Sequence, residues 1–178
     1  LGGLSSLMAA SIHAEVTNAP PVRYAIIGLV HDHARGFIPG AMTRSDVQLA
    51  GIVEPDRQLA ARYAALYHLN TNLFYASLKE LLAQTNVQAV ATFTSTFDHR
   101  RVVEECAPLG IDVMMEKPLA VSLADAHAVA AAAKKGGIQL IVNYETTWYP
   151  ANQEAYKMIC DQHVIGDLRK IVVQDGHQ

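Results

Sequence analysis

The sequence predicts an α/β fold, a doubly wound parallel sheet, followed by only the start of a second, α+β domain. Two observations lead to this prediction. Five short apolar runs alternate with segments of helical pattern, and runs that are apolar on both faces suit a parallel sheet covered by helices. Polar or glycine residues stand where these runs end, at Gly28, Glu54, Ser95 and Glu116. Alternating strands and helices imply right-handed crossovers, which place helices on both faces of the sheet.

The apolar runs are the expected strands: 22–28, 47–53, 87–94, 111–115 and 138–142. Helices are expected between them. Leu59, Tyr63 and Leu66 fall on one helical face. The segments 77–80 and 122–125 have the spacing of N-terminal capping boxes.

Helix ends can be predicted as well. Pro108 should end a helix at about Ala107, because proline lacks a backbone donor and clashes with the preceding turn. The alanine-rich helix 125–135 should stop at Gly136 and Gly137.

The most informative motif is Glu116-Lys117-Pro118, which follows the fourth apolar run. It places a lysine at the carboxyl end of a buried strand, the edge of an open α/β sheet where ligands bind. The proline fixes the backbone of the turn. The alternative is that Glu116 and Lys117 are ordinary loop charges.

These segments resemble the Gfo/Idh/MocA family of nicotinamide-dependent oxidoreductases, whose N-terminal domain is a Rossmann fold. The resemblance spans about 22–174 and rests on four groups of residues. They are Ile26-Ile27-Gly28, Glu54-Pro55-Asp56, Thr94-Ser95-Thr96 with His99, and Glu116-Lys117-Pro118-Leu119-Ala120. The stretches 143–150 and 164–166 resemble the family's passage into its second domain.

The resemblance implies an enzyme that transfers a hydride from a sugar or sugar-like alcohol to NAD. Lys117 is then the catalytic residue, orienting the substrate hydroxyl and assisting a residue of the second domain. Two alternatives stay open. One is an NAD-assisted glycosidase or lyase with no net redox change, and the other is a binding domain that has lost the cofactor.

Further cofactor contacts follow from the resemblance. Thr94 and Thr96 would bind the cofactor through hydroxyl or backbone groups, with His99 beside the nicotinamide ribose; the alternative for His99 is a helix cap. The turn of Glu116, Lys117 and Pro118 completes this set. Lys117 is expected to be partly buried, and the Lys117–Pro118 bond is a candidate for the cis form.

The first turn departs from the dinucleotide-binding pattern G-x-G-x-x-G. Only Gly28 is kept, and Val30 and His33 stand at the second and third glycine positions. Val30 adds bulk where phosphate should approach. The helix N-terminus still offers N–H groups and a partial positive charge to an anion. We therefore predict that Gly28, Val30 and His31 form a modified cofactor turn.

His31 and His33 have three interpretations. One caps the helix while the other faces solvent, or His31 contacts phosphate or substrate, or both bind a metal. No cysteine or third histidine lies at ligand spacing, so no metal site is expected.

Glu54 lies 26 positions after Gly28, near the place of the acidic residue that binds the ribose hydroxyls. A carboxylate there repels the 2′-phosphate of NADP, so NAD is predicted over NADP. Arg57 lies close by and could pair with a phosphate instead. In the remaining interpretation Glu54 only caps the following helix.

Composition excludes some functions. The formal net charge of −3 argues against a nucleic-acid binder. Cys106 and Cys160 both lie in apolar helical pattern, so we expect two buried thiols and no disulfide. Arg100 and Arg101 are interpreted as a solvated charge pair.

The two ends complete the organisation. Residues 1–14 are uncharged, too short for a membrane span, and similar to an export signal without its basic start. The prediction is a leader over 1–21, a dinucleotide-binding domain over 22–145 and a truncated second domain over 146–178, in which 168–174 is a strand. The protein is expected to be exported to the periplasm, and the alternative is a cytoplasmic protein. By resemblance, it would form a homo-oligomer through its second domain.

Overall fold

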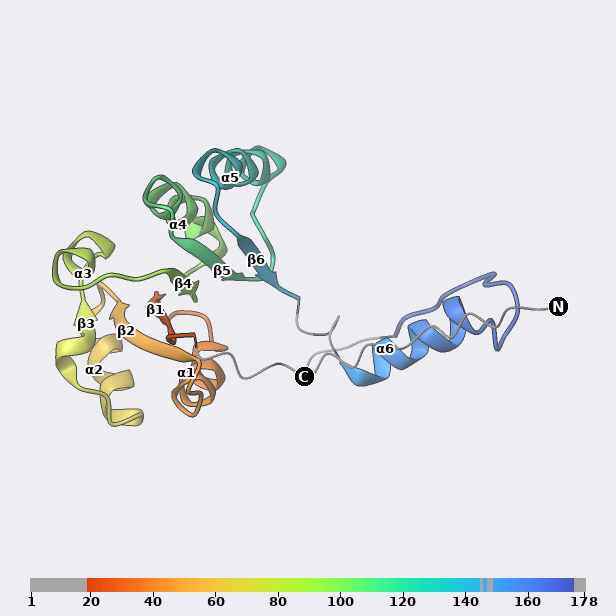
Figure 1. The fold of residues 1–178 in the computed structure, drawn as a ribbon, viewed down its shortest axis with the longest axis horizontal. Coiled ribbons are helices and arrows are strands. Elements are labelled where there is room, and N and C mark those ends of the chain that lie inside the picture. Colours follow the sequence, from red (N-terminus) through yellow and green to blue (C-terminus); the bar gives the residue numbers. More distant parts are fainter. Residues whose placement is uncertain (1–18, 145, 147–148, 175–178) are drawn as a thin grey trace.

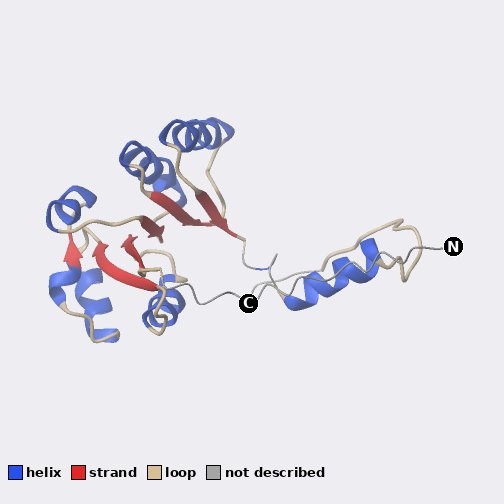
Figure 2. Cartoon of the chain, viewed as in Figure 1, coloured by secondary structure: helices blue, strands red, loops and turns tan. Residues whose placement is uncertain are grey.

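The computed structural model describes residues 19–144, 146 and 149–174, so the predicted leader lies almost entirely outside the described residues. Figures 1 and 2 show a parallel sheet with helices on both of its faces. The strands are β1 (Val22–Ile27), β2 (Val47–Val53), β3 (Phe74–Tyr75), β4 (Ala89–Thr92), β5 (Asp112–Glu116) and β6 (Leu140–Asn143). Their order across the sheet is β3-β2-β1-β4-β5-β6, and all pairs are parallel. The chain therefore reverses its direction of winding between β1 and β4, which confirms the predicted doubly wound sheet.

Two groups of helices cover the sheet. The α-helices are α1 (Ala34–Met42), α2 (Arg57–Leu66), α3 (Leu78–Gln84), α4 (His99–Cys106), α5 (Leu123–Gly136) and α6 (Pro150–Tyr156). Short turns of other helix types are η1 (Thr71–Leu73), η2 (Thr96–Asp98), η3 (Ala107–Leu109) and η5 (Lys157–Asp161). Figure 1 shows α1 and α2 on one side of the sheet and α3, α4 and α5 on the other.

The alternation of side chains along the strands produces two cores. In β1, Tyr24 and Ile26 pack in the cluster that includes α1 and α2, whereas Ala25 and Ile27 pack in the cluster of α3, α4 and α5. Successive strand residues point to opposite faces, so a strand buried on both faces must be apolar throughout. This is why the apolar runs were informative.

The local signals for helix ends are confirmed. The Ser77 hydroxyl accepts a hydrogen bond from the Glu80 N–H, and the Ser122 hydroxyl accepts one from Asp125. α4 ends at Cys106, two residues before Pro108. α5 ends at a cap of Gly137 with φ of +68°, a left-handed conformation that glycine adopts without strain.

Some expectations were wrong. Leu66 is exposed on α2, although Tyr63 in the same last turn is buried. β3 was not predicted, since two residues carry no period. Cys106 is buried, and burial raises the pKa of its thiol to about 12, but Cys160 is exposed.

The C-terminal segment differs from the rest. Figure 1 shows α6 extending away from the sheet, and none of its residues is buried. The predicted strand 168–174 has no regular structure, because no strand of the described residues pairs with it. Among the described helices none has the length and apolarity needed to cross a membrane.

Candidate functional site

A cleft opens at the carboxyl edge of the sheet, where the winding reverses between β1 and β4. In a doubly wound sheet this switch point is where ligands bind. The cleft has a volume of about 380 Å³, within the range of small-molecule sites. Four predicted cofactor residues line it, namely Gly28, Val30, Glu54 and Thr94.

Gly28 sits at a position that no other residue fits. Its φ is +76°, and a Cβ atom there would lie 2.6 Å from the Thr94 Cγ2 and 3.0 Å from the Thr94 backbone. The β1 turn and the β4 turn are therefore in close contact across the switch point. The one glycine kept from the dinucleotide motif is the one that this contact requires.

The rest of the first turn is held by hydrogen bonds. The His31 N–H donates to the Phe93 carbonyl at 2.9 Å, and the His33 N–H donates to His31 Nδ1 at 3.2 Å. Val30 is 68% exposed at the rim of the cleft. The Val30 side chain therefore lies beside the cleft and outside the core.

Glu54 joins the ends of β1 and β2. It is 6% exposed, its Oε2 accepts from the Leu29 N–H at 2.8 Å and its Oε1 accepts from the Asp56 N–H at 2.9 Å. Capping of α2 belongs to Asp56, whose carboxylate accepts from Gln58 and Leu59. Glu54 thus does not cap α2 itself. Its carboxylate sits at the cleft with both oxygens fixed by backbone N–H groups.

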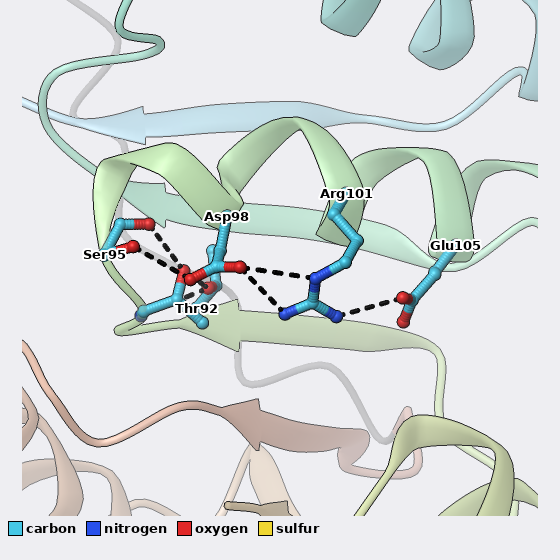
Figure 3. Close-up of polar contacts among 6 residues, drawn as sticks. Thr92, Ser95, Asp98, Arg101 and Glu105 are labelled. Atoms are coloured by element: carbon cyan, nitrogen blue, oxygen red, sulfur yellow. Dashed lines mark hydrogen bonds and ion pairs between the residues drawn. The ribbon is translucent and has the colours of Figure 1, made fainter. Parts of the chain in front are cut away.

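A polar network lines the opposite wall of the cleft (Figure 3). The Ser95 hydroxyl donates to Asp98, and Asp98 also bonds Arg101, whose guanidinium reaches Glu105 at 3.0 Å. Arg101 was expected to be solvated with Arg100. Both side chains are exposed, at 47% and 54%, as expected. Arg100 pairs with Glu104 and Asp125, and Arg101 also lines the cleft. The spacing of 98, 101 and 105 on one helical face is the signal that could have identified it.

The β5 turn forms the other end of the site. Glu116 is 1% exposed, and its Oε1 accepts from Asn143 Nδ2 at 2.9 Å. Lys117 is exposed, contrary to the expected partial burial. The Lys117–Pro118 bond is cis, as considered from the sequence.

His99 is fully buried, 1% exposed, and its Nδ1 lies 3.3 Å from the Leu119 carbonyl. It does not line the cleft, and neither does Thr96. His99 therefore supports the β5 turn from behind. Its side chain makes no capping hydrogen bond, nor does that of Asp98 at the start of α4.

The two turns meet through histidines. His33 Nδ1 lies 3.0 Å from Glu116 Oε2, and the His31 and His33 rings are 4.6 Å apart. Burial lowers the pKa of His31, against the attraction of Glu116. His33 and Asn143 are contacts of Glu116 that the sequence did not indicate, because each comes from a different strand connection.

Comparison with known proteins agrees with the Rossmann-type fold of the structure. Residues 22–144, more than half of the chain, match a family model described as an oxidoreductase family with an NAD-binding Rossmann fold, Gfo/Idh/MocA. The match begins at β1 and ends one residue after β6.

Individual relatives are more distant. The chain is 32% identical over 155 residues to the D-apiose dehydrogenase of Paraburkholderia graminis, covering 84% of this chain and 39% of that protein. It is 28% identical over 135 residues to the trans-1,2-dihydrobenzene-1,2-diol dehydrogenase of Sus scrofa, covering 76% and 39%. The chain thus spans about two fifths of the length of these curated relatives.

A solved structure shares the fold. The WlbA dehydrogenase of Bordetella pertussis, in complex with NADH and UDP-GlcNAcA, superposes with a TM-score of 0.70 at 22% identity. The superposition covers 82% of this chain and 41% of that one.

Proposed function

The chain belongs to the Gfo/Idh/MocA oxidoreductase family with an NAD-binding Rossmann fold, and on that basis we propose that it binds NAD and places it for hydride transfer from a sugar-like alcohol. The observation that carries this proposal is the cleft at the β1–β4 switch point, which Gly28, Glu54 and Thr94 line. Lys117 directly follows β5, the strand that pairs with β4.

The residues of the cleft fit a dinucleotide. A Cβ at Gly28 would fill the closest approach of the β1 and β4 turns. α1 begins directly after the turn, and the positive end of a helix favours an anionic group such as a pyrophosphate. Val30 narrows the phosphate approach from the rim without closing the cleft.

We propose a preference for NAD over NADP. The buried carboxylate of Glu54 is held at the cleft by two backbone N–H groups, so it cannot turn away from an incoming 2′-phosphate. Its lone pairs can still accept from ribose hydroxyls. Arg57 is exposed at the start of α2 and is the group that would favour NADP instead.

The chemistry assigned to this chain's residues is positioning and proton handling. Nicotinamide, when bound, accepts the hydride. The exposed ammonium group of Lys117 would hold the substrate hydroxyl at the end of β5. A positioned acid or base contributes about 10²–10⁴-fold to such reactions. The buried Glu116 and His99 would fix the turn that carries Lys117.

The test is calorimetric titration of the full protein with NAD and NADP, followed by turnover of candidate alcohols. We expect NAD to bind more tightly than NADP. Lys117→Ala should lower kcat by about 100-fold or more. Lys134→Ala, an exposed lysine of α5, is the matched control and should keep full turnover.

Each result separates one part of the proposal. Absence of binding by either dinucleotide would reject the cofactor site, and turnover by the Lys117→Ala variant would reject that residue. Net formation of NADH would distinguish a dehydrogenase from an enzyme with no net redox change. The named relatives are dehydrogenases, which does not favour the latter.

Three properties of the whole protein remain proposals. They are a sugar-like substrate bound with the help of a second domain, homo-oligomerisation through that domain, and export guided by the uncharged residues 1–14. An N-terminus near Glu15 in the native protein would support export, and one at Leu1 would contradict it.

A further inference from the structure

We propose that His31, His33 and Glu116 form a binding site for a divalent transition-metal ion, with Zn²⁺ as the best match. Among the described residues these three form the group whose ligand atoms all lie within 4.8 Å of one another. No metal site was expected from the sequence, because no cysteine or third histidine lies at ligand spacing. The third ligand is instead a carboxylate from the end of β5.

Glu116 is the strongest argument for a ligand. Its side chain is 1% exposed, and its Oε2 is buried without a hydrogen-bond partner. The contact of that oxygen with His33 Nδ1 at 3.0 Å is close enough for an ion pair but lacks the alignment of a hydrogen bond. A buried carboxylate oxygen without a partner is costly, and coordination of a cation is one way to compensate it.

The histidines approach the same oxygen from the first turn. They alternate at 31 and 33 on the turn between β1 and α1, and both rings are partly exposed. His31 Nδ1 accepts only a long bond of 3.2 Å from the His33 N–H. The imidazoles can therefore reach an ion at the surface while the carboxylate reaches it from inside.

The distances suit a small ion. Tetrahedral zinc with ligands at about 2.0–2.1 Å separates its ligand atoms by roughly 3.3 Å. The distance between His33 Nδ1 and Glu116 Oε2 is 3.0 Å, and all three ligand atoms lie within 4.8 Å of one another. Small side-chain rotations would therefore bring them to the spacing of a tetrahedral zinc site. Two imidazoles and one carboxylate favour zinc or a related transition ion over Mg²⁺, which takes oxygen ligands.

An outer contact orients the carboxylate. Asn143 at the end of β6 donates from Nδ2 to Glu116 Oε1, which directs the other oxygen, Oε2, toward the histidines. Hydrogen bonds of this kind fix the geometry of metal ligands.

Three protein ligands leave a coordination position open, as in zinc sites that bind a water or substrate oxygen. The site adjoins Lys117 in the chain. If the proposed function holds, the open position would take the hydroxyl oxygen of the alcohol, and the ion would polarise its O–H bond. Metal binding itself does not depend on that function.

The experiment titrates the chelator-treated full protein with Zn²⁺ by calorimetry, and with Co²⁺ while recording its visible absorption. The variants are His33→Ala and Glu116→Gln. The His33 side chain is 38% exposed, so its removal leaves the core intact if Glu116→Gln perturbs folding. Asp32→Asn is the matched control, since Asp32 is an exposed charge of the same turn that pairs with Arg35.

We expect one ion per chain, an affinity at least tenfold weaker in both variants, and no change in the control. Excess Mg²⁺ should not displace the ion. Failure of the unaltered protein to bind a stoichiometric ion would overturn the proposal, as would unchanged binding in both variants. NAD titration of the His33→Ala sample shows whether the cofactor site is intact, because His33 is not among the predicted cofactor contacts.

Discussion

Two buried glutamates at the carboxyl edge of the sheet differ in how their charges are satisfied. Glu54, at the end of β2, has both oxygens bonded to backbone N–H groups. Glu116, at the end of β5, has one oxygen bonded to Asn143 and the other without a hydrogen bond. Both are nearly excluded from solvent, at 6% and 1% exposure.

The difference shows how burial and bonding together distinguish two roles. Backbone donors that are already in place make Glu54 part of the turn, and a ligand can use only its remaining lone pairs. Glu116 keeps an oxygen that the protein itself does not satisfy, beside two imidazoles and next to an exposed lysine. Buried polar groups are nearly always hydrogen-bonded, and this exception is the basis for the metal site that we propose.

The largest loss of stability should come from a substitution in the turn after β1, where the Leu29 N–H donates to Glu54. Gly28→Ala forces a side chain into positive φ and against Thr94, so we expect a loss of about 2–4 kcal/mol of unfolding free energy. Urea denaturation measures it. Gly36→Ala in α1 is the control, because its Cβ would meet no atom within 4 Å and should be neutral or stabilising. Equal effects of the two changes would contradict the close contact.

The comparison itself can be tested by making the same change at both glutamates. Glu54→Gln places an amide donor against a backbone N–H and leaves one of them unpaired, so stability should fall by about 1–3 kcal/mol. Glu116→Gln removes a half-satisfied buried charge while the Asn143 contact can persist, so without metal it should change stability by less than about 1 kcal/mol. Thermal or urea unfolding measures the stability of both variants. A larger loss of stability in Glu116→Gln than in Glu54→Gln would contradict the different roles of the two glutamates.

A smaller effect should follow from restoring the second glycine of the motif. Val30→Gly removes exposed bulk from the rim of the cleft, so NAD should bind several-fold more tightly, a gain of about 1 kcal/mol. Calorimetry measures it. Val121→Gly, another exposed valine, should leave NAD affinity unchanged. If Val30→Gly behaves like this control, Val30 does not restrict the phosphate approach.

Much of the fold could be predicted because its signals are local. A strand buried on both faces must be continuously apolar, so five of the six strands were located to within a few residues. Ser77, Ser122, Pro108 and Gly137 act through their own turns of backbone, and each behaved as expected. β3, with two residues, was too short to carry a pattern.

Prediction was weaker where several elements meet. The position of Arg101 at the cleft depends on which face of α4 lies beside the cleft. The exposure of Leu66, Lys117 and Cys160 depends on which elements fail to cover them. None of these facts is encoded in the spacing of neighbouring residues.

The doubly wound sheet, the position of Glu54 and Glu116 at its carboxyl edge, and the family resemblance could all be predicted from the amino-acid sequence. Periodicity and the order of motifs can be recognised along the chain without knowledge of its tertiary contacts. The tertiary structure alone decided that His33 and Asn143 meet Glu116. The three residues follow or end three different strands. His33 lies 83 positions before Glu116 in the chain, and Asn143 lies 27 positions after it. Parallel strands bring their carboxyl ends to one edge of the sheet whatever their separation in the chain, and the side chains that meet there are set by strand order and register.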